Sequence, residues 1–207
     1  MADMVAGGAG AQQYHGMRIV AGSFGGRVLS APPGAATRPT SEKVREALFN
    51  ILGPPPDDTH VLDLFAGSGA LGFEALSRGA ASVTFVERAR PALAALRGNI
   101  GLLGVATQAS FVPVEVARFL QLAAAGAGPA WRWVFLDPPY AAGVVSDSLA
   151  ALPRARLTDD AVVIVEHAHR APSPDRAGFL LRTDLRRYGD TELSFYRAQR
   201  ASDASHP

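Results

Sequence analysis

The stretch VLDLFAGSGALG, residues 61–72, decides the fold, because an apolar segment leads directly into a glycine-rich turn and then into a helical pattern. Val61–Phe65 is apolar except for Asp63 and predicts a buried strand. The glycines then follow the pattern G-x-G-x-x-G ahead of a helix expected over Leu71–Ser77. This order is typical of an open parallel α/β sheet that holds a ligand at the carboxyl ends of its strands.

Strands and helices continue to alternate after this stretch. The expected strands are Val83–Glu87, Phe111–Val114, Trp133–Asp137 and Val162–Glu166, and the expected helices are Pro91–Leu103 and a short one through Phe119 and Leu120. Alternation with short connections predicts the α/β class with a parallel, doubly wound sheet. Phe179–Tyr188 and Leu193–Arg197 flank Gly189-Asp190 and predict a closing hairpin, so one strand of the sheet should run antiparallel.

The amino-terminal part predicts an appendage to this sheet. Arg18–Leu29 indicates a hairpin around Gly25-Gly26, and Thr40 or Ser41 is expected to cap a helix that ends near Gly53. We therefore expect four segments in the chain. Residues 1–16 and 201–207 are predicted disordered tails, residues 17–52 a hairpin and helix, and residues 53–200 the core.

Composition limits the function classes. The 207 residues suit one domain, and 48% hydrophobic with 19% charged residues is globular rather than disordered. The absence of cysteine excludes disulfides, thiolate metal sites and cysteine nucleophiles. A net charge of +1 gives no overall basic field, so any nucleic-acid surface must be local. No apolar run is long enough to cross a bilayer, and we expect a cytoplasmic monomer.

Asp63 indicates which ligand the glycine turn holds. A dinucleotide turn offers backbone N–H groups to a pyrophosphate, and a carboxylate at that place would repel the anion. The same carboxylate suits a cation such as the α-ammonium group of S-adenosylmethionine, while Gly67 and Gly69 let the backbone approach the ligand closely. We therefore expect S-adenosylmethionine as cofactor, and a dehydrogenase is disfavoured. The alternative is a turn without a ligand.

Other residues near the same edge complete the expected cofactor site. Glu87 ends the second strand, where an acid can accept hydrogen bonds from both ribose hydroxyls. Glu115 follows the third strand and either accepts from the adenine amino group or complements a helix dipole. The full set of expected cofactor residues is Asp63, Phe65, Gly67, Gly69, Glu87, Arg88, Glu115 and Thr40.

The fourth strand ends in Asp137-Pro138-Pro139-Tyr140, which predicts the catalytic residues. The prolines remove two backbone donors, so the Asp137 carboxylate and the Pro138 carbonyl are left as neighbouring acceptors. Two acceptors match an exocyclic amine that donates two hydrogen bonds, and holding both can aim the nitrogen lone pair at a methyl group. Tyr140 offers a face for stacking of an extruded base. The alternative is a proline-stiffened turn with a packing tyrosine.

Two other methylation chemistries fit less well. Methylation of pyrimidine carbon 5 normally uses a cysteine nucleophile, and the chain has none. Methylation of a glutamine amide typically uses Asn-Pro-Pro-Tyr, whereas this chain has Asp137 at the first position.

With these motifs in place, the chain resembles the RsmD family of bacterial small-subunit ribosomal RNA guanine-N2 methyltransferases. The likeness covers residues 17–198 and rests on Met17–Gly22 with Gly25-Gly26-Arg27, on Thr37–Thr40 with Val44–Leu52, on Asp63–Gly72, on Asp137–Tyr140, and on Tyr188–Thr191 with Ser194–Tyr196. The glycine turn and Asp-Pro-Pro-Tyr are shared by many amino-methyltransferases. The helix after Arg38 and the hairpin at Tyr188–Thr191 point to this family.

The resemblance implies a class I S-adenosylmethionine-dependent methyltransferase, with a seven-stranded, mostly parallel sheet, one antiparallel strand and an N-terminal β-hairpin. It implies a guanine N2 amine of 16S ribosomal RNA as the methyl acceptor. It assigns Asp137, Pro138 and Tyr140 to the target base, beside Pro139. Arg38, Thr40 or Lys43 would contact the cofactor carboxylate or an RNA phosphate. The first 16 residues and Ala123–Ala130 have no counterpart in the family pattern.

Expected partners follow from local charge. Basic residues outnumber acidic ones near the amino terminus, and Arg18, Arg27, Arg38 and Lys43 are the candidate contacts to ribosomal RNA or to an assembling small subunit. His167 and His169 are interpreted as loop residues, and no metal is expected. Two alternatives stay open, a DNA adenine-N6 methyltransferase and a non-catalytic assembly factor that binds S-adenosylmethionine.

Overall fold

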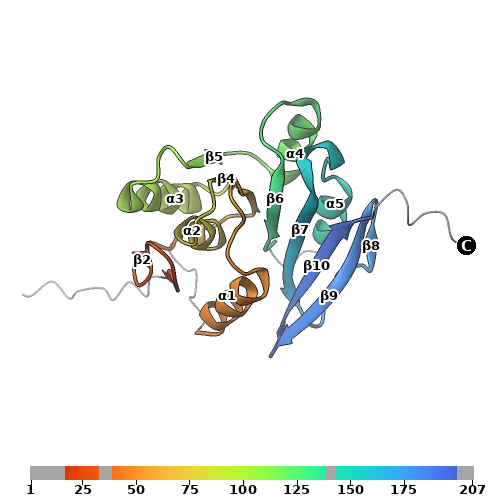
Figure 1. Ribbon diagram of the computed structural model, residues 1–207, viewed down its shortest axis with the longest axis horizontal. Helices are drawn as coiled ribbons and strands as arrows, with labels where there is room; N and C mark the ends of the chain where they lie inside the picture. Colours follow the sequence, from red (N-terminus) through yellow and green to blue (C-terminus); the bar gives the residue numbers. More distant parts are fainter. Residues whose placement is uncertain (1–16, 33–38, 139–142, 200–207) are drawn as a thin grey trace, which may run out of the picture.

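The computed structural model describes residues 17–32, 39–138 and 143–199, and these form one twisted sheet with helices on both faces (Figure 1). The expectations for residues 1–16 and 201–207 lie outside the described residues. The division of the chain at residues 52 and 53 into an appendage and a core stays a prediction.

The main sheet has the strand order β5-β4-β3-β6-β7-β10-β9-β8. Its parallel strands are β5 (Ala109–Val112), β4 (Ser82–Val86), β3 (His60–Leu64), β6 (Trp131–Leu136) and β7 (Leu157–Ala168). Antiparallel pairs then join β7 to β10 (Thr191–Ala198), β10 to β9 (Leu180–Tyr188) and β9 to β8 (Arg176–Ala177). The parallel, doubly wound α/β fold is therefore confirmed.

The count of seven strands is wrong by one, because the described residues add β8 at the edge of the sheet. β8 has only two residues, Arg176–Ala177, and pairs antiparallel with β9. Two residues are too few to show the alternation of apolar and polar side chains by which a strand is recognised. The expected antiparallel strand is β10, which pairs with β7 through six residue pairs and makes the sheet continuous with the closing hairpin.

The helices are α1 (Pro39–Leu52), α2 (Ala70–Ser77), α3 (Arg90–Leu103), α4 (Val116–Ala125), α5 (Val144–Ala150) and a 3₁₀ turn at Arg154–Arg156. The expectation that Thr40 or Ser41 caps α1 is wrong, because the helix already includes Pro39. Proline is favoured in a first helical turn, where its fixed φ fits and its missing N–H is not needed. β5 also begins two residues earlier than expected, and α5 was not expected.

Two buried apolar layers hold the helices on the sheet, and they follow from the alternation of side chains along each strand. Val61, Phe85 and Phe135 point to the layer that also contains residues of α1, α2 and α3. Leu62 and Val134 point to the opposite layer, which α4 and α5 cover. The helices thus cover both faces of the parallel part of the sheet, and the carboxyl ends of its strands are left to line a cavity.

The hairpin of β1 (Met17–Arg18) and β2 (Val28–Leu29) has the expected antiparallel pairing and is held to the core by a buried carboxylate. Glu74 is fully buried in α2 and accepts hydrogen bonds from the backbone N–H of Val20 (2.7 Å) and Ala21 (3.0 Å). Arg45 of α1 lies 3.6 Å from Glu74 and donates to the carbonyl of Arg18 at 2.5 Å. This network fixes hairpin, α1 and α2 relative to one another.

Candidate active site

The carboxyl ends of three neighbouring strands meet at the candidate site. Leu64 of β3 pairs with Val86 of β4 on one side and with Leu136 of β6 on the other. The residues that follow, Phe65, Glu87 and Asp137, therefore leave the sheet side by side. The chain reverses its winding direction between β3 and β6, and such a switch point is the usual ligand site of an open α/β sheet.

A cavity of about 650 Å³ opens at this edge. Its lining comes from the ends of β3, β4 and β6, from the first turn of α4 and from α5: Phe65, Val86, Glu87, Arg88, Ala89, Val114, Glu115, Val116, Ala117, Leu120, Asp137, Val144, Asp147, Ser148 and Ala151. Apolar walls with acidic side chains at the rim suit a ligand that has a flat apolar part and hydrogen-bond donors.

A second, smaller cavity of about 150 Å³ adjoins the glycine turn and shares Phe65 and Asp137 with the first. Its other lining residues are Met17, Arg45, Asp63, Ala66, Gly67, Ser68, Ala70, Leu71 and Glu166. Asp63, Asp137 and Glu166 bring three carboxyl groups to one small space, against one buried guanidinium group from Arg45.

Asp63 is the most buried of these carboxyl groups, with 2% of its surface exposed. Its Oδ2 accepts a hydrogen bond from the N–H of Gly72 at 3.0 Å. Burial raises the pKa of Asp63 well above its ordinary value, and the neighbouring Asp137 and Glu87 raise it further. The ionised form of Asp63 is therefore unfavourable in the protein without ligand.

The glycine turn has the backbone that only glycine adopts easily. Gly67 and Gly69 have φ of 55° and 83°, and a Cβ atom on Gly69 would lie 2.5 Å from the Phe73 ring. Phe65 also has a positive φ, 62°, which is uncommon for a bulky residue and costs about 1–2 kcal/mol. This strained residue lines both cavities, and such strain is often kept at functional sites.

Glu87 is fixed by backbone hydrogen bonds. Its Oε2 accepts from the N–H of Gly67 at 2.9 Å, and its Oε1 accepts from the N–H groups of Arg88 and Ala89, both at 2.7 Å. The carboxylate therefore ties the glycine turn to the end of β4. Carboxylate oxygens accept more than one hydrogen bond each, so lone pairs are left for a ligand in the larger cavity.

Arg88 and Glu115 form an ion pair at the rim of the larger cavity, with 68% and 60% of their side chains exposed. At that exposure the pair contributes little to stability. Glu115 also directly precedes α4, so both interpretations offered by the sequence agree with its position. Contact of either residue with a ligand stays a prediction.

Asp137 and Pro138 lie where the strand pattern predicted. Asp137 follows β6, is exposed to both cavities, and has a pKa raised to about 6 because the surrounding protein displaces water. Pro138 is buried. Pro139 and Tyr140 lie outside the described residues.

Glu166 also lines the smaller cavity and was not among the candidate residues predicted from the sequence. It lies near the end of β7, and burial together with the neighbouring Asp137 raises its pKa to about 8. The sequence contains no motif that indicates this position. The strand register does, because Val165 pairs with Leu136 and thereby places Glu166 beside Asp137.

The candidate RNA contacts are spread over the hairpin and α1. Arg18 donates to the carbonyl of Gly26 at 2.9 Å, and Arg27 donates to the carbonyl of Leu102 at 3.2 Å. Lys43 is exposed on α1. Arg38 and the side chain of Thr40 lie outside the described residues. RNA contact by these residues stays a prediction.

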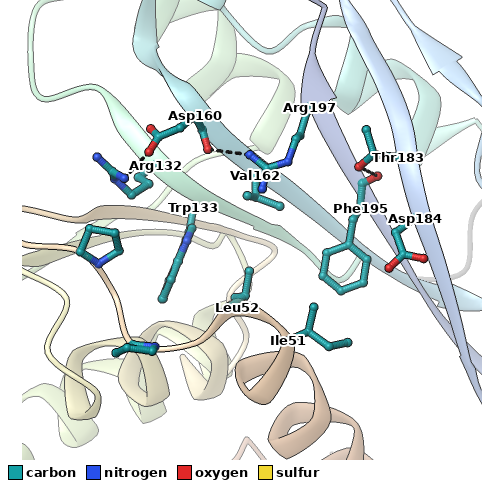
Figure 2. Close-up of a pocket in the computed structure, with 12 residues that line it drawn as sticks. Ile51, Leu52, Arg132, Trp133, Asp160, Val162, Thr183, Asp184, Phe195 and Arg197 are labelled. Carbon is teal, nitrogen blue, oxygen red and sulfur yellow. Dashed lines mark hydrogen bonds and ion pairs between the residues drawn. The ribbon is translucent and has the colours of Figure 1, made fainter.

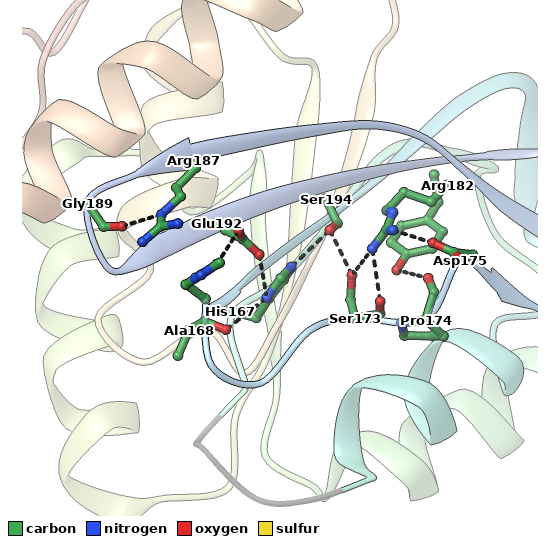
Figure 3. Close-up of polar contacts among 12 residues, drawn as sticks. His167, Ala168, Ser173, Pro174, Asp175, Arg182, Arg187, Gly189, Glu192 and Ser194 are labelled. Atoms are coloured by element: carbon green, nitrogen blue, oxygen red, sulfur yellow. Dashed lines mark hydrogen bonds and ion pairs between the residues drawn. The ribbon is translucent and has the colours of Figure 1, made fainter.

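The interpretation of His167 as a loop residue is wrong. His167 is buried in β7, and its Nε2 lies 2.9 Å from the Ser194 hydroxyl (Figure 3). Nδ1 of His169 lies 2.6 Å from Oε1 of Glu192. The pairing of β7 with β10 places Glu192 directly opposite His167, although they are far apart in sequence. Over residues 17–32, 39–138 and 143–199, no group of three or more His, Cys, Asp or Glu side chains could hold a metal ion.

A third cavity, of about 410 Å³, lies between the end of α1 and the strands β6, β7, β9 and β10 (Figure 2). Its lining includes Arg132 and Trp133 at the beginning of β6, not the carboxyl end of that strand. Arg132 and Asp160 pair with each other there, and Arg197 donates to the carbonyl of Asp160 at 3.1 Å. Its charges are thus matched within the protein, unlike those at the glycine turn.

The chain is similar to known proteins over most of its length. The protein-family model described as "Conserved hypothetical protein 95" matches residues 17–197. The chain is 38% identical over 182 residues to the putative rRNA methyltransferase YlbH of Bacillus subtilis, which covers 87% of this chain and 98% of the relative. It is 40% identical over 151 residues to the ribosomal RNA small subunit methyltransferase D of Escherichia coli, which covers 72% of this chain and 74% of the relative.

A solved structure described as a putative methyltransferase, yhhF from Escherichia coli, has the same fold, with a TM-score of 0.73 and 35% identity, and the match covers 89% of this chain and 99% of that one. None of the described helices is long and apolar enough to cross a membrane. The family match extends over nearly all described residues. The chain therefore belongs to the family of Conserved hypothetical protein 95, which is the RsmD family that its motifs resemble.

Proposed function

We propose that this protein transfers a methyl group from S-adenosylmethionine to the exocyclic N2 amine of a guanine in small-subunit ribosomal RNA. Two similar proteins are named as ribosomal RNA methyltransferases, which supports ribosomal RNA as the substrate class. One observation carries the proposal. Asp137, whose pKa is raised to about 6, lies beside the glycine turn and the buried Asp63 at adjacent strand ends.

The residues of both cavities fit the cofactor. S-adenosylmethionine carries a sulfonium, an ammonium and a carboxylate, so its net charge is positive. In the protein without ligand, Asp63 and Asp137 have raised pKa values because the carboxyl groups are desolvated, and for Asp63 also because Asp137 and Glu87 repel it. A cation beside them makes their ionised forms favourable. A pyrophosphate would have the opposite effect.

The two cavities suggest how the cofactor lies. The smaller one, with Asp63 and Gly67, would hold the amino-acid end, and the larger one, with Glu87 and Glu115, the ribose and adenine. When bound, the cofactor supplies an electrophilic methyl group. Arg88 and Glu115 would close the rim over the adenine.

The acceptor amine would be held by Asp137 and the Pro138 carbonyl. At pH 7.5 the Asp137 carboxyl group, with its pKa of about 6, is mostly ionised and accepts one N–H of the amine. The backbone carbonyl of Pro138 accepts the other. Two fixed acceptors orient the nitrogen lone pair, which is catalysis by positioning and electrostatics. The proton is lost from the nitrogen after methyl transfer, so no strong base is required.

The partners follow from this role. The substrate would be ribosomal RNA or an assembling small subunit, with Arg18, Arg27, Arg38 and Lys43 contacting phosphates. The protein would act in the cytoplasm, as a monomer and without a metal ion.

The test measures transfer of labelled methyl from S-adenosylmethionine to undermethylated small subunits, to naked ribosomal RNA and to duplex DNA, followed by nucleoside analysis. We expect N2-methylguanosine from the ribosomal substrates. N6-methyladenine in the DNA would instead support an adenine methyltransferase.

Asp137→Asn tests the catalytic assignment in the same assay. The amide still accepts one hydrogen bond but has no charge, and we expect the rate to fall about 100-fold or more, since removing one preorganised charge-stabilising group has that effect in other enzymes. Asp57→Asn, on the exposed loop after α1, is the matched control and should keep the full rate. Full activity of Asp137→Asn would contradict the proposal.

A further inference from the structure

Glu166 is the one carboxyl group of the smaller cavity that the proposed reaction does not use. Since Val165 and Leu136 pair in the parallel strands β7 and β6, Glu166 and Asp137 are the next residues on each strand and lie next to each other. Both line the smaller cavity. Glu166 is half-buried, and its partner across β10 is the apolar Leu193.

Burial and the charges of its neighbours both act on the Glu166 carboxyl group. The charged groups that share its cavity are Asp137 from β6, Asp63 from β3 and Arg45 from α1. Burial and Asp137 raise the pKa of Glu166 to about 8, with Arg45 acting in the opposite direction. In the protein without ligand the group is therefore mostly neutral at pH 7 and has both an O–H donor and a carbonyl acceptor.

A neutral carboxyl group matches one edge of guanine. Beyond the N2 amine, guanine presents an N1–H donor and then an O6 acceptor, which pair with the C=O and O–H of a carboxylic acid in a cyclic arrangement. Adenine held by its own amine presents an N1 acceptor followed by C2–H, so only one of these two hydrogen bonds can form. With adenine, one polar atom of the buried carboxyl group would have no hydrogen-bond partner, which lowers affinity strongly. Hydrogen-bond recognition of this kind can favour one base over another by large factors.

We propose that Glu166, which lies beside Asp137 in the smaller cavity, is the residue that selects guanine: its carboxyl group accepts a hydrogen bond from N1–H and donates one to O6, while Asp137 and Pro138 hold the N2 amine. This inference rests on the proposed function, and it adds the contact by which the same site recognises its base. Glu166 is a specificity-determining residue in this arrangement, and Asp137 keeps the catalytic contact.

Glu166→Gln tests the protonation state. The amide has an acceptor and a donor in the same places as the neutral acid but does not ionise. We expect the single-turnover rate of the unmodified protein to fall about tenfold between pH 7 and pH 9, because a group with a pKa of about 8 is then mostly ionised. Glu166→Gln should be active at pH 7 and lose much less of its rate by pH 9. Ionisation of the RNA itself affects both proteins equally.

Glu166→Leu tests base selection, using the RNA found in the first assay made with either guanosine or 2-aminopurine riboside at the target position. 2-Aminopurine keeps the amine but lacks N1–H and O6. We expect the unmodified protein to prefer guanosine by roughly 100-fold in kcat/KM, and Glu166→Leu to lose most of that preference through a slower reaction with guanosine. The melting temperature of each variant, measured without ligand, serves as the folding control.

The outcomes separate the two proposals. If N2-methylguanosine forms but Glu166→Gln shows the same decline with pH as the unmodified protein, or Glu166→Leu keeps the preference for guanosine, the role of Glu166 is overturned and the proposed function stands. If the unmodified protein forms no N2-methylguanosine on any ribosomal substrate, both are overturned.

Discussion

At the scale of single residues, the main feature of the candidate site is a group of carboxyl groups whose pKa values are raised by the surrounding protein. Asp63 is buried beside the glycine turn, and its pKa is raised well above its ordinary value by desolvation and then by Asp137 and Glu87. Asp137 has a pKa of about 6 for the first of these reasons. Groups placed in this way cost stability when they are ionised without a partner, so their position beside the glycine turn suggests a cationic ligand.

Asp63→Asn is expected to separate stability from binding. Since the native pKa of Asp63 is raised, its contribution favours folding at low pH and is lost as the pH rises above about 4, the value for an unfolded aspartate. The amide removes this cost and still accepts from the Gly72 N–H. At pH 7.5 we expect a melting temperature equal to or above that of the unmodified protein.

The same variant should bind S-adenosylmethionine at least tenfold more weakly in calorimetry, because the charge partner of the ammonium group is gone. Asp57→Asn, at an exposed position that precedes β3 while the glycine turn follows it, should change neither quantity. Unchanged affinity of Asp63→Asn would remove the ammonium contact from the proposal.

At the scale of elements, one of the contacts between the N-terminal hairpin and α2 requires a very close approach of the two backbones. Gly22 has φ of 84°, and a Cβ atom at this position would lie 1.9 Å from the carbonyl oxygen of Ser77. The N–H of Ser23 donates to that same oxygen at 2.7 Å. The position requires glycine twice, once for its backbone conformation and once for the close approach.

Gly22→Ala and Gly26→Ala form a matched pair that separates these two requirements. Gly26 has nearly the same φ, 83°, but a Cβ atom at this position would meet no other atom within 4 Å. Both variants should lose about 1–2 kcal/mol of unfolding free energy for the backbone strain. Gly22→Ala should lose roughly 1–3 kcal/mol more, because the hairpin must move from α2.

Urea unfolding measures the difference, and limited trypsin digestion after Arg18 or Arg27 reports release of the hairpin. Equal losses in the two variants would show that the contact with Ser77 does not hold the hairpin in place.

At the scale of the whole molecule, one edge of the sheet collects groups from most of the chain. The smaller cavity takes Met17 from the hairpin, Arg45 from α1, Asp63 from β3 and Glu166 from β7. Two apolar layers, one on each face, fix these elements and leave the carboxyl edge open. Binding at that edge should therefore stabilise the entire fold.

Cofactor binding is expected to depend on pH. The bound cation favours the ionised forms of Asp63 and Asp137, so the complex holds fewer protons than the free protein, and affinity should rise as the pH increases through about 6. At pH 7.5 and 100 times the dissociation constant, S-adenosylmethionine should add about 2.7 kcal/mol and raise the melting temperature by roughly 5–10 °C.

Thermal scans with and without S-adenosylmethionine measure the rise in melting temperature at pH 5.5 and at pH 7.5, with the same cofactor concentration at both pH values. S-adenosylhomocysteine, which lacks the sulfonium charge, is the control and should show a weaker dependence on pH. A rise in melting temperature with S-adenosylmethionine that is larger at pH 5.5 than at pH 7.5 would contradict the charge argument.

The sequence by itself determined the parts of this protein that depend on local chemistry. The glycine turn after Asp63 and the Asp137-Pro138 strand end follow from side-chain periodicity and from the special φ angles of glycine and proline, which act between residues close in the chain. Since parallel strands align their carboxyl ends, these motifs also predicted the position of the site.

The tertiary structure alone decided which distant residues meet. Glu166 lies beside Asp137, Glu74 joins Arg45 to the hairpin, and Glu192 lies opposite His167 only because of strand register and helix packing. In the sequence, these buried glutamates cannot be distinguished from the exposed glutamates that are usual in strands and helices. Their burial and their altered pKa values arise from desolvation and from neighbouring charges, and both depend on segments that are brought together only when the chain folds.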